Sequence, residues 1–370
     1  MGVIDSLTKG FQHVHRRWWV LLIPILLDAF LWIGPHASVA QIVRSSVTAV
    51  DVEQLGLTST EEEAAAVEAT IDEFVSDVVP HYNGFSALRI GTLGLPSLAT
   101  WGVSRGEIPT GYEAMWLVFL TVTDLPDMLL SSYESMWVVL VLMLDMPELL
   151  SAVSEASFVD VAVWQFASEG VWMLATLGLA CLGIVVGSVY IVSISRTVDD
   201  EGAFWPQMLR FCVRFTLFWI LRFVLLVAAG IPLTMIAVLL AAFSPGLASL
   251  YSTVIAGLLV WLSFYGIFLV TAMAVNHVSI WRAIWNSFNI VLRNFWPTFA
   301  LFALINLIGG GLSILWQQMS NGSLLTLLSI VGNAYVGTGL VAASMIFYQD
   351  RYQRWQEVLS ELLRRSQRLA

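Results

Sequence analysis

The sequence has little charge. Only 12% of its 370 residues are charged, against roughly 25% in a typical soluble domain, whereas 58% are hydrophobic. This composition excludes an ordinary soluble globular protein, and we expect no nucleic-acid partner. Most of the chain must lie in lipid, so the bilayer is the first partner that the sequence predicts.

Cysteine and histidine are also scarce. Cys181 and Cys212 lie in or beside apolar runs, which suits buried packing, and their spacing forms no metal or redox motif. His13 and His15 point to opposite sides of a helix, and no histidine pair has metalloprotease spacing. The sequence has no phosphate-binding loop, dinucleotide fingerprint or nucleophile elbow. We therefore expect no catalytic residues, no enzymatic activity, no metal and no cofactor.

Long apolar runs are what the sequence has instead. A helix needs about 20 mostly apolar residues to cross a bilayer, and six runs qualify. They are residues 18–34, 170–194, 215–243, 250–275, 295–316 and 324–348. We expect an all-α, polytopic transmembrane helical bundle whose spans are interrupted only at Pro24 and Pro232.

The basic residues lie mostly on one side of these spans. Of the 17 Lys and Arg residues, 14 lie on one side or within reach of it, and the exceptions are Arg44, Arg89 and Arg105. The positive-inside rule makes that side cytoplasmic. We therefore expect a plasma (inner) membrane protein with both termini in the cytoplasm. Residues 35–168 become an extracytoplasmic insertion, and 18 acidic residues lie within 36–165.

A cleavable signal peptide is the competing interpretation of the first span, with Ser38-Val39-Ala40 as the cleavage site. The apolar stretch is long for a signal peptide and contains Asp28. The segment that precedes it also recurs later in the chain. These features favour a retained span.

The recurring segment is "GFQHVHRRWW" from Gly10, which matches "SFNIVLRNFW" from Ser287, with a fainter copy, "QMLRFCVRF", from Gln207. Each copy predicts a cytoplasmic interfacial helix whose arginines face lipid phosphates. Each is followed by a pair of spans, which gives three helix-plus-hairpin units; convergent juxtamembrane composition is the alternative. The predicted headgroup contacts are Arg16, Arg17, Arg210, Arg214, Arg282 and Arg293.

These patterns divide the chain into five segments. Residues 1–17 form an interfacial helix and 18–34 the first span, followed by the insertion, 35–168. A five-span bundle, 169–348, and a basic amphipathic cytoplasmic tail, 349–370, complete the chain.

The insertion contains a doubled stretch, "YEAMWLVFLTVTDLPDML" from Tyr112 and "YESMWVVLVLMLDMPELL" from Tyr133. Asp124 and Asp145 have the sequence context of helix N-caps, and a capping box at Thr60 predicts an earlier acidic helix. We expect a mostly helical insertion lying on the outer face of the bundle. Two further spans, or an aqueous domain with its own core, are the alternatives.

Two stretches, "HVSIWRAIWNSFNIVLRNFWPTFALF" from His277 and "ASMIFYQDRYQR" from Ala343, carry a family resemblance. The chain resembles the bacterial six-span membrane-domain families found alone or fused to glycerophosphodiester phosphodiesterases. The resemblance covers about the last 170 residues and implies architecture more than chemistry. The acidic metal site and paired histidines of the phosphodiesterase domain have no counterpart in this sequence.

Four polar residues lie within the predicted spans: Asp28, Arg222, Asn306 and Asn333. Polar groups at this depth mark functional sites by default, and an Asp28–Arg222 ion pair is the structural alternative. Two function classes follow. One is a non-catalytic membrane protein that scaffolds partners, including other membrane proteins, or organises lipid. The other is a transporter or channel that uses these four residues.

Overall fold

The computed structural model describes residues 1–38, 85, 87–88, 95–98, 163–166, 169–198, 203–319 and 324–369. The elements are α1 (Val3–Arg16), η1 (Trp18–Leu21), α2 (Leu22–Ile33), β1 (His36–Ser38), β2 (Val163–Gln165), α8 (Glu169–Val198), α9 (Phe204–Phe243), α10 (Pro245–Tyr265), α11 (Leu269–Val275), α12 (Ile280–Arg293), α13 (Phe295–Met319) and α14 (Leu324–Leu369).

Five described helical segments are long and apolar enough to cross a membrane: Gly170–Val198, Phe204–Ala241, Gly246–Val275, Phe295–Leu312 and Leu325–Leu362. Each overlaps one of the predicted spans. The first predicted span corresponds to a shorter apolar segment, Trp18–Ile33, which η1 and α2 form together. The helical membrane architecture is therefore confirmed, while the count of six spans stays a prediction.

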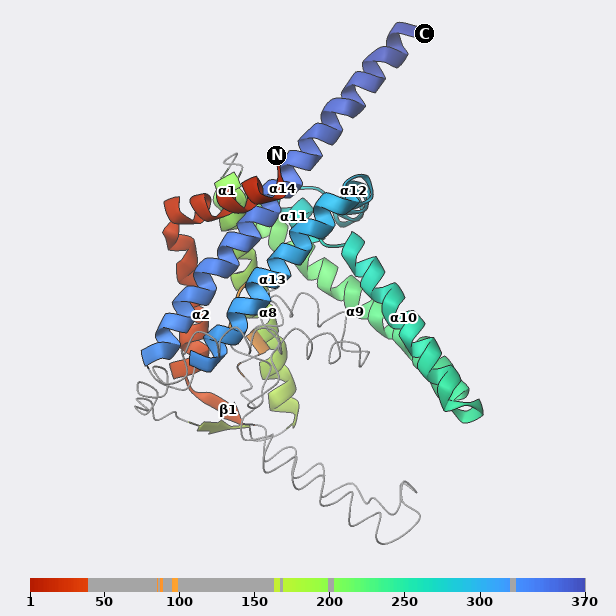
Figure 1. The fold of residues 1–370 in the computed structure, drawn as a ribbon. Helices are drawn as coiled ribbons and strands as arrows, with labels where there is room; N and C mark the ends of the chain where they lie inside the picture. Colours follow the sequence, from red (N-terminus) through yellow and green to blue (C-terminus); the bar gives the residue numbers. More distant parts are fainter. Residues whose placement is uncertain are drawn as a thin grey trace, which may run out of the picture.

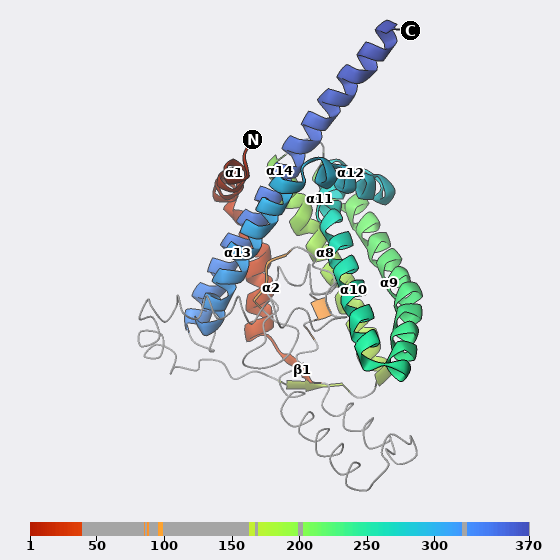
Figure 2. The same ribbon diagram turned by 45° about the vertical axis from the view of Figure 1, so that its right-hand side comes forward.

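The bundle has two distinct ends. In Figures 1 and 2, α2, α8, α13 and α14 run between them, and α1 and α12 lie across one end, which we call the α1/α12 end. α14 packs against both α1 and α13. The C-terminal part of α14 extends beyond the α1/α12 end (Figure 1).

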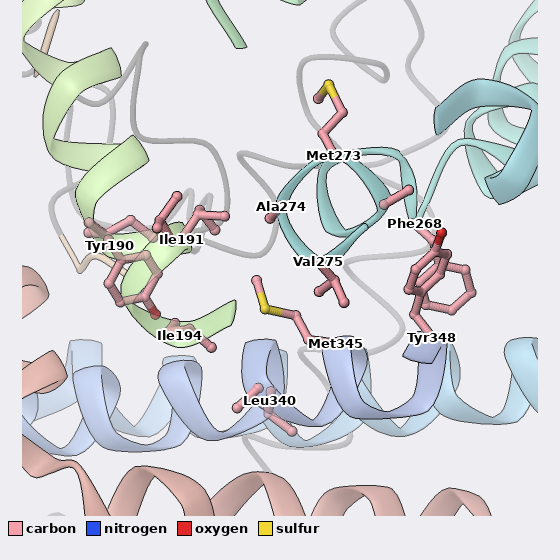
Figure 3. Packing of buried hydrophobic residues seen from close by; sticks show 14 of the residues in the cluster. Tyr190, Ile191, Ile194, Phe268, Met273, Ala274, Val275, Leu340, Met345 and Tyr348 are labelled. Atoms are coloured by element: carbon pink, nitrogen blue, oxygen red, sulfur yellow. The ribbon is translucent and has the colours of Figure 1, made fainter. Parts of the chain in front are cut away.

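The core lies where α8, α11 and α14 meet, close to the α1/α12 end. Residues 271–275 of α11 are all buried, because α8, α12 and α14 all contact this short helix. Val275 and Met345 fill the space between α11 and α14 in Figure 3, and Tyr190 faces the same space from α8.

α9 and α10 form a hairpin that diverges from α13 and α14 (Figures 1 and 2). In the most apolar 18-residue window of Phe204–Ala241, none of the side chains that the structure describes is buried, so in a bilayer this surface contacts lipid or another membrane helix. Cys181 of α8 is exposed and Cys212 of α9 is half-buried. The prediction of buried packing is therefore wrong for Cys181, because a helix in lipid need not bury its apolar side chains.

The interruption predicted at Pro232 is wrong, because α9 continues through it. Near Pro24 the first span does change, from the 3-10 helix η1, which ends at Leu21, to α2. Pro24 lies in the first turn of α2, where helices tolerate proline. The chain instead breaks between α10 and α11, at residues 266–268. At the C-terminus, α14 is one helix of 46 residues, so the predicted last span and the predicted tail share an uninterrupted helix.

The two ends of the insertion meet in a short parallel strand pair, β1 and β2, with His36 opposite Val163 and Ser38 opposite Gln165. The sequence predicts a mostly helical insertion, and these strands are a local exception to it. The acidic helix from Thr60 and the doubled stretch from Tyr112 lie outside the described residues.

Candidate functional site

Asp28 is the most deeply buried acidic side chain of the described chain, with 2% of its surface exposed. It lies on the face of α2 that also buries Pro24, Leu27 and Leu31. This helical spacing turns the carboxylate into the bundle and away from lipid. A carboxylate in such a place must be hydrogen-bonded, because its desolvation is otherwise costly.

The hydrogen bonds come from the insertion. The Ser97 hydroxyl donates to Oδ1 of Asp28, and the backbone N–H of Leu98 donates to Oδ2 at 2.9 Å. Residues 95–98 are not helical, yet Leu95 and Ser97 are buried. Non-helical backbone at membrane depth is tolerated where protein buries it or where it lines a cavity. A short loop segment of the insertion is thus tied to α2.

Arg222 does not meet Asp28. Its guanidinium carbon lies 5.0 Å from the centre of the Trp219 ring on the same helix, a cation–π geometry. α2 and α9 are separated in both Figure 1 and Figure 2, and no ion pair joins Asp28 to Arg222 in the described part of the chain. The predicted pair is wrong because similar depth in a membrane does not make two helices neighbours.

The two asparagines lie on other helices than Asp28, Asn306 on α13 and Asn333 on α14. Asn306 is half-buried and its Nδ2 donates to the carbonyl of Phe302, 2.8 Å away on its own helix. Asn333 of α14 is 7% exposed. Within the described residues, no interaction joins any two of the four predicted polar residues, and no group of three His, Cys, Asp or Glu side chains could hold a metal ion.

Sequence reasoning missed a polar contact in the core. The hydroxyl of Tyr190 in α8 donates to Oγ1 of Thr338 in α14 at 3.0 Å, and neither residue is exposed. Tyrosine and threonine are common in apolar helices, so neither side chain gave a signal in the sequence.

The break between α10 and α11 is held by a second such contact. Ser287 of α12 donates its hydroxyl to the carbonyl of Tyr265 at 2.6 Å and accepts the N–H of Phe268 at 3.2 Å. One buried side chain thus satisfies a donor and an acceptor that an unbroken helix would have paired.

The predicted headgroup arginines fall into two groups. Arg17 donates to the carbonyl of Arg196 at 3.0 Å, Arg214 donates to that of His277 at 2.6 Å, and Arg293 lies 5.6 Å from the ring centre of Trp355. These three tie the elements of the α1/α12 end to one another. The side chains of Arg16, Arg210 and Arg282 are exposed.

α1 and α12 correspond in register. Each contains 14 residues, and the three buried positions of α1, Ser6, Gly10 and Val14, correspond to Ala283, Ser287 and Val291, which are buried in α12. α12 also buries Asn286 and Ile290. Both end alike, because the N–H groups of Arg17 and Asn294 each bond to the carbonyls three and four residues earlier. Exposed tryptophans lie on or beside both helices, at Trp18, Trp19, Trp281, Trp285 and Trp296.

No family model, no curated protein and no solved structure matches the chain.

Proposed function

We propose that this is a non-catalytic, six-span protein of the plasma (inner) membrane. It scaffolds membrane partners or organises lipid from its α1/α12 end, and both of its termini are cytoplasmic. The observation that carries the proposal is the pair α1 and α12, two amphipathic helices that lie across the same end of the bundle (Figure 1). Trp281 and Trp296 are 72% and 75% exposed there. Tryptophan at helix ends is typical of the membrane interface.

Charge supports the same arrangement. Arg16, Arg210 and Arg282 are exposed on three elements of this end, and amphipathic helices with basic polar faces bind anionic lipid surfaces. The apolar surface of α9 and α10 supplies a second face, which we assign to lipid or to the spans of other membrane proteins.

The internal repeat belongs to this proposal. The shared register of α1 and α12, with matching buried positions and matching ends, supports a duplicated unit. The copy at Gln207 differs, because α9 continues from it into the span without a break. We assign three helix-plus-hairpin units, and the uninterrupted α9 represents the second.

Lipid retention tests whether the α1/α12 end organises lipid. Arg16, Arg210 and Arg282 are replaced together by Gln, and the protein is extracted from nanodiscs that contain phosphatidylglycerol and phosphatidylcholine. We expect native mass spectrometry to show several-fold less phosphatidylglycerol than on the unchanged protein. As a control, Arg354, Arg364 and Arg365 of the extending part of α14 are changed to Gln. We expect this variant to retain as much phosphatidylglycerol as the unchanged protein. Equal loss in both variants, or no loss in the first, contradicts the assignment.

A transporter or channel is the second candidate. The observation that favours it is the buried Asp28 carboxylate bonded to the non-helical residues 95–98. Ser97→Cys in a background without Cys181 and Cys212 tests it with a membrane-impermeant methanethiosulfonate reagent. Rapid modification means that water reaches Asp28 and favours transport, whereas resistance under conditions that label an exposed control cysteine favours the scaffold.

A further inference from the structure

An apolar cavity of about 400 Å³ lies beside α8. Its lining residues are Phe85, Trp164, Phe166, Ala175, Gly178, Leu179 and Leu182. The volume is within the range of roughly 300–1,000 Å³ that is typical of ligand sites. None of these described lining residues is charged, so this part of the cavity suits an apolar ligand segment.

Gly178 forms one wall of the cavity. A β-carbon built on Gly178 meets no atom within 4 Å. The opposite wall is aromatic and is tied to α2, since Phe30 packs edge to face on Phe85 at 5.7 Å between ring centres. Phe85 packs in the same way on Trp164 at 6.0 Å. The cavity is thus lined by α8, where Gly178 leaves room for a side chain, and by aromatic rings tied to α2.

The depth of the cavity identifies the solvent around it. Its α8 residues begin at Ala175, five residues into the candidate span Gly170–Val198, which corresponds to about 7 Å of helix rise. Leu174 and Leu177, on the neighbouring turns, are exposed. In a bilayer these leucines contact hydrocarbon, so lipid chains lie next to the part of α8 that lines the cavity.

We propose that this cavity binds one hydrocarbon chain of a bilayer lipid, at the end of the bundle opposite α1 and α12. The α8 lining extends over about 10 Å of helix rise, from Ala175 to Leu182, which fits a single extended chain segment better than a bulky headgroup. Trp164 lines the cavity and its ring is exposed, so its N–H can accompany the polar end of the lipid. This site needs the protein to be embedded in a membrane but does not depend on the scaffold role.

The test uses the full chain in nanodiscs doped with a phosphatidylcholine that carries a photoreactive diazirine in one acyl chain. Gly178→Trp fills the cavity from a position with room for a side chain. Gly230→Trp is the matched control, because a β-carbon at Gly230 of α9 also meets nothing within 4 Å and Gly230 does not line the cavity.

We expect crosslinks to concentrate on the cavity residues of α8, Phe85 and Trp164, and to fall at least fivefold in Gly178→Trp while Gly230→Trp retains them. Crosslinks spread evenly over Leu174, Leu177 and the exposed face of α9 overturn the proposal, because they report only the bulk bilayer. Unchanged crosslinking of cavity residues in a folded Gly178→Trp protein overturns it as well. Melting temperatures of both variants show that each is folded.

Discussion

A β-carbon on Gly10 of α1 would lie 2.6 Å from the carbonyl oxygen of Gly339 in α14, so the two helices cross with backbone against backbone. The ring of Phe11, the next residue of α1, covers Gly339 and leaves no room for a side chain there. Small residues allow this close approach, which supplies the van der Waals contact on which membrane helices depend.

Gly10→Ala is therefore expected to destabilise the protein. The neighbouring atoms are main-chain atoms of Gly339 and Ala343, which cannot move aside, and overpacking costs about 1–3 kcal/mol. A lower melting temperature in detergent measures the effect. Gly230→Ala, a helical glycine with open space around it, is the control and should match or exceed the original stability. Equal melting temperatures of the two variants would contradict the close contact between the backbones of α1 and α14.

The Tyr190–Thr338 hydrogen bond is expected to couple α8 to α14. Tyr190→Phe and Thr338→Val each remove one partner and keep most of the volume. Hydrogen bonds between membrane helices contribute about 0.6 kcal/mol on average, so the double variant should be less destabilised than the sum of the single variants by about that amount. Additive losses in a double-mutant cycle would show that the two hydroxyls do not interact.

Asp28 is expected to anchor the insertion. Asp28→Ala leaves the Ser97 hydroxyl and the Leu98 N–H without their acceptor, and an unsatisfied buried polar group costs about 1–3 kcal/mol. Limited proteolysis from the side of the insertion should become faster in Asp28→Ala and in Ser97→Ala. The Arg222→Ala variant is the control, since Arg222 lies on another helix away from Asp28. If proteolysis becomes faster in Arg222→Ala but not in Asp28→Ala or Ser97→Ala, Asp28 does not anchor the insertion.

Ser287→Ala is expected to loosen the junction of α10 and α11. The change leaves the Phe268 N–H and the Tyr265 carbonyl without their buried partner, so we expect a loss of about 1–3 kcal/mol. Ser360→Ala removes a hydroxyl that bonds locally to Glu357 on the exposed part of α14 and should cost far less. Hydrogen exchange at residues 265–269 measures the opening. Similar exchange in both variants would mean that Ser287 does not hold the break.

The sequence was sufficient to identify most of the architecture. Long apolar runs predict the helices, because a bilayer requires about 20 apolar residues in any span. The spacing of apolar and basic residues likewise predicts helices at residues 10–17 and 287–294, which lie in and next to α1 and α12. These inferences depend on chain-local properties, namely the length of a run and the spacing of its apolar residues.

The sequence was not sufficient where the outcome depends on contacts between distant segments. The partner of Asp28 is Ser97, 69 residues away, in a stretch without a helical period. The break after Tyr265 has no proline, and it is stable because Ser287 of another helix pairs its free groups. Arg222 was assigned to Asp28 from depth alone, whereas helix adjacency decides such a pair.

Membrane orientation is tested by labelling. At the α1/α12 end, Arg17 bonds to the carbonyl of Arg196 and Arg214 to that of His277. Arg351 donates to the carbonyl of Met1 at 3.0 Å. A membrane end so rich in arginine should face the cytoplasm, because positive loops are retained on that side.

In a background where Cys181 and Cys212 are replaced by Ala, an impermeant maleimide applied to intact cells is expected to label Thr58→Cys, in the predicted outer insertion. It should leave Ser366→Cys, near the C-terminus, unlabelled until the cells are opened. Labelling of Ser366→Cys in intact cells, with Thr58→Cys protected, would reverse the topology. The exposed arginines Arg16, Arg210 and Arg282 would then face the outer leaflet, and the cytoplasmic scaffold would be excluded together with the orientation.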